Sequence, residues 1–153
     1  MRTLTEEEMA KMAYQMVELI KSSFDKGIRE SVRTRCRQLY SSLYYSGVLS
    51  TLAFTYAKAE SEDLVKKICE WIDASLKGER IRPPVEEKEK LSYAVYTAFF
   101  CRLFRAIGIE NKGELGKIIH VLTSEKSPYL IEDTALRFAR WLKRFAEALL
   151  KGE

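Results

Sequence analysis

Arginines spaced by one helical turn are the residues of this sequence best suited to bind a ligand. In the stretch IRESVRTRCRQLY, Arg29, Arg33 and Arg37 recur every fourth residue, which places them on one side of a helix. Tyr40 and Tyr44 continue this stripe. Because guanidinium groups pair bidentately with phosphate and tyrosine rings stack on bases or ribose, the stripe suits an acidic ligand such as nucleic acid.

A second basic cluster lies close to the end of the chain. Residues 137–151 contain five basic side chains and a single acid, Glu147. The helical period groups four of the five near Trp141, namely Arg137, Arg140, Lys143 and Arg144. Two solvated faces that complement acidic neighbours would also explain these charges. Their single sign and aromatic neighbours strengthen the case for nucleic acid, but both interpretations stay open.

Side chains for catalysis or metal binding are sparse. The one histidine, His120, lies in the apolar context KIIHVL, which predicts a packed core or boundary residue rather than a ligand or base. Carboxylates cluster at predicted helix N-termini, where the helix dipole accounts for them without a metal. The chain contains no nucleotide-binding loop motif and no Cys/His set with zinc spacing. We therefore expect no enzyme, no metal and no cofactor.

The bulk composition predicts one globular domain over 1–153. The chain is 46% hydrophobic and 31% charged, and its net charge of +4 permits an acidic partner without requiring one. No apolar run approaches the roughly 20 residues of a membrane span, and no signal peptide is recognisable. Cys36, Cys69 and Cys101 are widely spaced and are predicted to be small buried hydrophobes. A cytoplasmic protein without a membrane partner is expected.

Helical periodicity runs through the whole chain, and no segment alternates with the period of a strand. The first helix opens at the capping box formed by Thr5 and Glu8, and Gly27 is predicted to close the turn after it. The later helices are predicted over about 28–45, 48–59, 62–77 and 86–107, in a short segment ending near Leu122, and over 128 to about 150. The prediction is an all-α single-domain bundle of six to seven helices.

Two connections are distinctive. Ser46-Gly47 is predicted to end the second helix with a C-cap glycine. The helix that follows, VLSTLAFTYAKA, is mostly apolar and is predicted to lie in the core. Pro83-Pro84 interrupts the helical pattern, so residues 78–86 are predicted to be a surface loop rather than a domain boundary.

Two motifs resemble those of a known family. The run TALRFARWLKRFAEALL, above all WLKRFAEA, and the run SGVLSTLAFTYAK are similar to signatures of the small α-helical subunit of type III-B CRISPR Cmr effector complexes. The motifs occur in the expected order, with a proline-containing loop between them. The chain departs from the family pattern at Thr134, where a glutamate is usual a few residues before WLKR, and residues 78–125 give no specific match.

The resemblance implies a non-catalytic subunit of an RNA-guided ribonucleoprotein in antiviral defence. Several copies would stack as a filament beside the backbone subunits that hold the guide RNA, together with a large subunit, and would line the path of the target RNA. Lys58 matches the lysine that ends the AFxxxK motif, and Lys143 and Arg144 match the basic pair of WLKR. The predicted RNA-binding residues are Arg29, Arg33, Arg37, Lys58, Arg137, Arg140, Lys143 and Arg144.

Three other interpretations remain. The small subunit of a type III-A complex is also helical and similar in size. A small DNA-binding regulator would use arginine-rich helices, although no helix-turn-helix pattern with a polar recognition helix is present. A helical adaptor or an unrecognised enzyme is the third interpretation, and the missing site chemistry argues against the enzyme.

Overall fold

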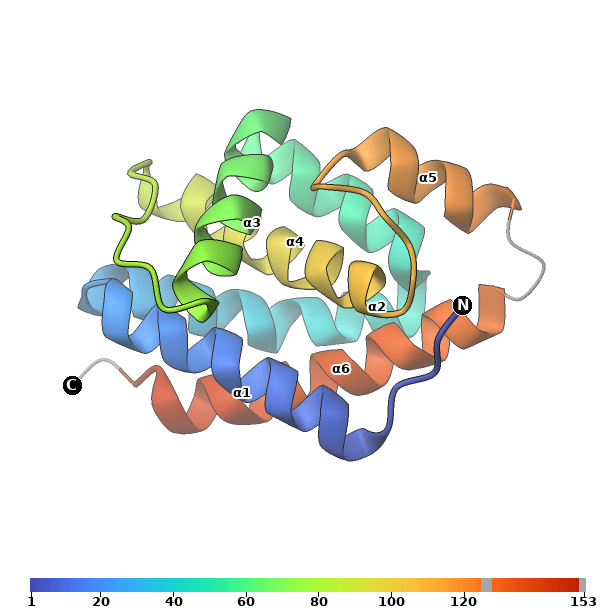
Figure 1. The fold of residues 1–153 in the computed structure, drawn as a ribbon, viewed down its shortest axis with the longest axis horizontal. Coiled ribbons are helices and arrows are strands. Elements are labelled where there is room, and N and C mark those ends of the chain that lie inside the picture. Colours follow the sequence, from blue (N-terminus) through green and yellow to red (C-terminus); the bar gives the residue numbers. More distant parts are fainter. Residues whose placement is uncertain (125–127, 152–153) are drawn as a thin grey trace.

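The computed structural model describes residues 1–124 and 128–151, and every regular element in these ranges is a helix. This confirms the predicted all-α class (Figure 1). No helix within the described ranges is long and apolar enough to cross a membrane. The elements are α1 (Glu6–Ser23), α2 (Lys26–Ala59), α3 (Glu62–Leu76), α4 (Lys88–Ala106), α5 (Leu115–Ser124) and α6 (Pro128–Leu149).

Helix α4 forms the centre of the bundle, with α2 and α3 packed against it and with α1 and α6 along one side (Figure 1). Residues 91–101 are buried without interruption, as expected of a helix that is apolar on all sides. An aromatic ring of α4 also packs against α6: Phe100 contacts Phe138 edge to face, with 5.6 Å between the ring centres. Such pairs contribute about 0.5–1.5 kcal/mol beyond their area burial.

Helix α2 folds back on itself at Gly47, whose φ of 86° and ψ of 174° are non-helical. The hydroxyl oxygens of Ser42 and Thr51 are 2.7 Å apart, whereas a straight helix would separate these positions by roughly 13 Å. The two limbs of α2, residues 26–46 and 48–59, are therefore separate helices in space. The prediction of two helices divided at Gly47 is confirmed.

The start of α6 holds this fold-back in place. The carboxylate of Glu132 accepts the backbone N–H of Val48 at 3.1 and 3.0 Å, which satisfies one of the free donors at the start of the second limb. A Cβ atom on Gly47 would lie only 3.2 Å from the same carboxylate. The positive φ favours glycine at this position, and a Cβ there would also require the Glu132 carboxylate to shift slightly.

Two predictions about these helices are wrong. Gly27 lies inside α2 and does not close the preceding turn, because Asp25 caps α2 by accepting the N–H of Ile28 at 3.0 Å. The limb 48–59 is not wholly in the core. Since α4 covers only one side of it, its outer positions are exposed, namely Leu49, Ser50, Ala53, Phe54, Ala57 and Lys58.

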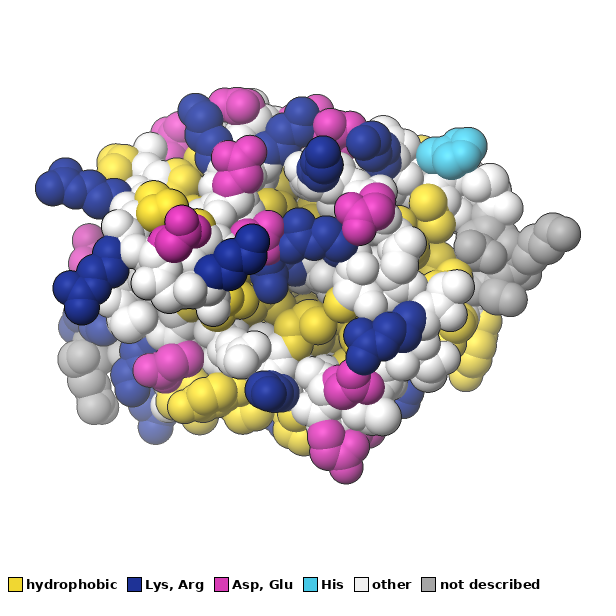
Figure 2. All heavy atoms as spheres, in the orientation of Figure 1, with side chains coloured by type: hydrophobic (Ala, Val, Ile, Leu, Met, Phe, Trp, Pro, Cys, Tyr) yellow, Lys and Arg dark blue, Asp and Glu magenta, His cyan; other side chains and the backbone are white. Residues whose placement is uncertain are grey.

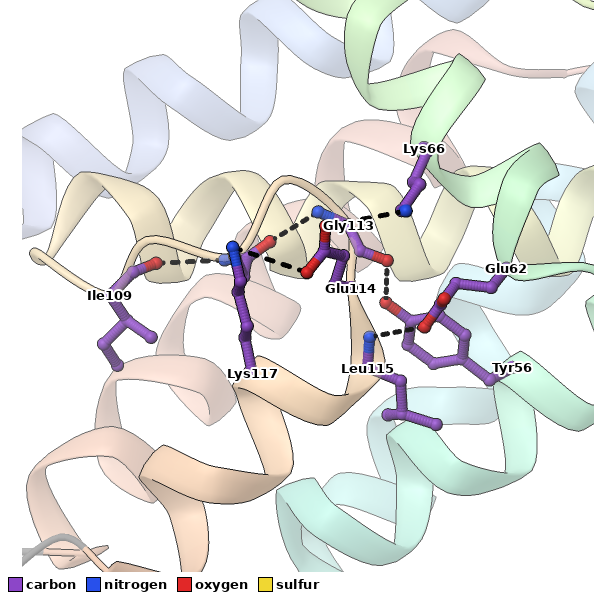
Figure 3. A network of polar contacts seen from close by, with 9 residues as sticks. Tyr56, Glu62, Lys66, Ile109, Gly113, Glu114, Leu115 and Lys117 are labelled. Atoms are coloured by element: carbon purple, nitrogen blue, oxygen red, sulfur yellow. Dashed lines mark hydrogen bonds and ion pairs between the residues drawn. The ribbon is translucent and has the colours of Figure 1, made fainter.

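The connection between α4 and α5 is fixed by a buried polar network (Figure 3). The amide of Asn111 donates to the carbonyls of Cys101 and Ile109, both at 3.0 Å, and accepts the N–H of Gly113 at 2.8 Å. The Tyr56 hydroxyl donates to the Gly113 carbonyl at 2.7 Å, and burial raises the pKa of Tyr56 well above its ordinary value. These bonds tie the connection to α2 and α4.

The three cysteines are all buried and free, as predicted. Burial raises the pKa of the Cys36 thiol to about 12. Because the thiolate is the reactive form, this thiol is chemically inert at neutral pH in the folded chain.

Candidate nucleic-acid interface

The first limb of α2 and helix α6 lie antiparallel, so the two basic segments predicted from the sequence meet in space. At one point Arg37 Nε lies 3.7 Å from Glu147 Oε1, and one turn further Lys143 Nζ lies 5.4 Å from the centre of the Tyr40 ring. We use the name basic surface for the residues gathered at this contact, which are Arg37, Tyr40, Arg140, Lys143, Arg144 and Glu147.

The basic surface is concave. A depression of about 360 Å³ is lined by all of these residues except Arg37. Arg140 and Arg144 are exposed, while Tyr40 and Lys143 are half-buried at the junction of the two helices. The pair of helices therefore presents several cations to one open hollow, an arrangement that suits phosphate binding.

Aromatic rings support the cations of this surface. The Arg144 guanidinium carbon lies 5.4 Å from the centre of the Trp141 ring, a cation–π distance. A hydrogen bond with Tyr40 raises the pKa of Arg140 further above its already high value. These guanidinium groups stay charged at neutral pH and retain N–H donors that can point to a ligand.

On the face of the molecule shown in Figure 2, basic and acidic side chains are interspersed. The gathering of cations around Tyr40 is thus a local feature rather than a consequence of the modest net charge of +4. Within the basic surface the only acid is Glu147, and Arg37 partly neutralises it.

Arg137 points away from the basic surface and joins α6 to α1. Its guanidinium lies 3.3 Å from both Glu6 and Asp133, and Trp141 Nε1 donates to Glu6 at 2.7 Å. The spacing of basic residues along α6 groups Arg137 with Arg140, Lys143 and Arg144. In the structure, however, Arg137 pairs with Glu6, which lies near the other end of the chain. The sequence pattern of α6 alone could not predict that Glu6 contacts this helix.

Arg29 and Arg33 share the helix side of Arg37 but are only half-exposed. The Nε atom of each is buried, without a hydrogen-bond partner among the described residues. Arg35 lies on another side of the helix and ties α2 to α4, because its Nε donates to Ser92 at 3.1 Å and its guanidinium stacks on Tyr93. Of the first arginine stripe, Arg37 lies closest to the cluster on α6.

Two further residues lie elsewhere. Lys58 is on the second limb of α2, where Nζ lies 5.6 Å from the Phe54 ring centre and the adjoining groove contains Glu60, Glu87 and Lys90. The structure does not bring Lys58 to the basic surface.

His120 is exposed on α5, so its prediction as a packed or boundary residue is wrong. α5 buries mainly the side of Ile118 and leaves the histidine side in solvent.

A family model described as CRISPR-associated protein (Cas_Cmr5) matches residues 5–149. The chain belongs to the Cmr5 family. The match runs from the N-cap of α1 to the last residue of α6, so both halves of the basic surface lie within the Cmr5 region. This confirms the family resemblance carried by the two sequence motifs.

A curated relative matches nearly the whole chain. The CRISPR system CMR subunit Cmr5 of Saccharolobus solfataricus is 23% identical over 154 residues, which is 99% of each chain. No solved structure is significantly similar to the chain.

Proposed function

We propose that this chain is the non-catalytic small subunit of a type III-B effector ribonucleoprotein and that its basic surface contacts the target RNA. Membership of the Cmr5 family supports the assignment to such a complex. The observation that carries the RNA contact is the meeting of Arg37, Tyr40, Arg140, Lys143 and Arg144 from two helices far apart in sequence. Partners would be the guide-holding backbone subunits, the large subunit and further copies of the chain.

The chemistry of the basic surface suits binding rather than cleavage. Guanidinium and ammonium groups donate hydrogen bonds to phosphate oxygens, but at neutral pH they hold their protons and cannot act as general bases. Contacts to phosphate fix a strand in position without reading its sequence. A subunit of an RNA-guided complex needs this property, because base pairing with the guide supplies the specificity.

The experiment is the salt dependence of RNA binding by the complex assembled from this chain, its partner subunits and a guide RNA. Each phosphate contact contributes about 0.7 to the slope of log affinity against log salt for single-stranded RNA. The triple variant Arg140→Ala, Lys143→Ala, Arg144→Ala is expected to lower this slope by roughly 2. An unchanged slope, with the complex still assembled, would contradict the assignment.

The matched control replaces Lys77, Arg80 and Arg82 with alanine. These side chains are exposed on the connection between α3 and α4 and change the net charge by the same amount. We expect the control to leave the slope nearly unchanged. An equal loss in both triple variants would indicate a response to net charge rather than contacts at the basic surface. Preference for duplex DNA would favour a regulator instead.

A further inference from the structure

Two tyrosines at the end of the first α2 limb leave their rings in solvent. Tyr44 is 61% exposed and Tyr45 is 82% exposed, and their ring centres lie 4.9 Å apart in an edge-to-face arrangement. We call these two residues the tyrosine pair. Aromatic side chains normally contribute to stability by being buried, so rings this exposed add little to the packing of the chain. Their faces are available to a ligand.

Tyr44 lies on the seam at which the first limb of α2 packs against α6 (Figure 1). Three contacts fix the register of this antiparallel seam, in order along α2: Arg37 with Glu147, Tyr40 with Lys143, and Val48 with Glu132. Tyr44 follows Tyr40 on the same side of the helix, between the second contact and the third. It therefore lies one helical turn, or roughly 6 Å along the axis, beyond the tyrosine of the basic surface.

The charges around the tyrosine pair favour a polyanion. The α2 segment between Glu30 and Glu60 contains no aspartate or glutamate. Helix α6 contains three acids, and each has a partner: Glu132 accepts the N–H of Val48, Asp133 lies 3.3 Å from Arg137, and Glu147 pairs with Arg37. A phosphate strand held at the basic surface can therefore continue over the two rings without meeting an unpaired carboxylate of these helices.

Resting on the proposed function, which brings an RNA strand to the basic surface, we propose that the tyrosine pair stacks on a base of that RNA that is not paired with the guide. The cations hold phosphates and the rings hold a base, so the two surfaces bind different parts of one strand. Because every base has a π-face, stacking accepts any sequence, as an RNA-guided complex requires.

The arrangement of the two rings suits this role. In an edge-to-face pair each ring limits the movement of the other, so less side-chain freedom is lost when a base binds. The tyrosine hydroxyls could also donate hydrogen bonds to the strand, and replacing tyrosine with phenylalanine separates this contribution from stacking.

Photo-cross-linking tests the contact in the assembled complex. Target RNAs carry iodouridine at one position at a time, opposite the guide and in the single-stranded flanks, because this base cross-links to aromatic side chains that stack on it. We expect cross-links to the peptide that contains Tyr44 and Tyr45, and we expect the double variant Tyr44→Leu, Tyr45→Leu to abolish them. The double variant Tyr44→Phe, Tyr45→Phe keeps both rings and is the matched control, with an unchanged yield.

Cross-links that persist in the leucine variant would overturn the proposal. The same conclusion would follow if iodouridine reached the chain only through α6, because the strand would then pass the cations without contacting the tyrosine pair.

The salt dependence of binding provides a second readout, which distinguishes a stacked base from a phosphate contact. Stacking releases no counterions, so the leucine variant should bind RNA about fivefold or more weakly at every salt concentration, with an unchanged slope. The target pairs with only part of the guide, so that protein contacts remain a measurable share of the affinity. The phenylalanine variant should bind as the unaltered chain does. An equal loss in both variants would assign the effect to the hydroxyl groups and contradict stacking.

Assembly of the leucine variant is checked by size-exclusion chromatography. Both rings are exposed, so the variant should fold and join the complex as the unaltered chain does. If it no longer co-eluted with the partner subunits while its circular dichroism spectrum was unchanged, the tyrosine pair would contact a protein, and the proposal would be wrong.

The two proposals fail separately. If only the stacking is wrong, the leucine variant binds RNA normally, while the triple variant of the basic surface still lowers the salt slope. If only the phosphate contact is wrong, the triple variant leaves the slope unchanged, whereas the iodouridine cross-link to the tyrosine pair still forms and still requires its rings.

Discussion

Arg37 and Glu147 join two helices across the basic surface, with 3.7 Å between Nε of the arginine and Oε1 of the glutamate. Both side chains are substantially exposed, so the pair contributes little to stability, about 0–1 kcal/mol. Its position matters more than its strength, because Glu147 is the acid that a phosphate group would have to displace from Arg37.

Replacing Glu147 with glutamine is therefore expected to strengthen RNA binding. The change removes a negative charge from the depression and frees Arg37, so affinity should rise about two- to fivefold, with a salt slope steeper by up to about 0.7. Titration of the assembled complex with target RNA measures both quantities. Glu79→Gln, in the exposed connection after α3, makes the same charge change elsewhere. If it gave an equal gain, the effect would come from net charge alone.

Gly47→Ala is expected to destabilise the fold by roughly 1–3 kcal/mol. At a φ of 86° and ψ of 174° a side chain is strained, and the new Cβ would press on the Glu132 carboxylate. Urea unfolding followed by circular dichroism measures the change. Gly116→Ala is the control, since Gly116 lies in α5 with open space around it. That variant should be neutral or up to about 1 kcal/mol more stable, and similar losses at both positions would refute the special role of Gly47.

The capping box of α1 should make stability depend on pH. Hydrogen bonding of Glu8 to the Thr5 backbone, with Arg2 adding to it, lowers the pKa of the carboxyl in the folded state. The contribution is therefore fully present above the pKa of the unfolded chain, about 4.3, and is lost as pH falls through the lower folded value. Unfolding midpoints of the unaltered chain and Glu8→Gln should converge in that acidic range. A constant difference between them down to pH 2 would contradict the linkage.

The sequence by itself determined the helices and most of their ends. The apolar period of 3.6 residues is a local property, as are the caps at Thr5 and Ser61, so they can be recognised in one segment at a time. The division of α2 at Gly47 was predictable for the same reason. The family motifs also lie within single segments, and the family they indicate is confirmed.

Only the tertiary structure decided which charges act together. Arg137 and Arg140 are equivalent in the helical pattern of α6. In the structure, Arg137 forms an ion pair with Glu6 from the start of the chain, whereas Arg140 is exposed. The apolar composition of 48–59 likewise predicted a core helix, because composition does not tell how many sides its neighbours cover. Contacts between segments that are distant in sequence decide which side chains are exposed and which acid pairs with each arginine. The sequence of a single segment does not contain this information.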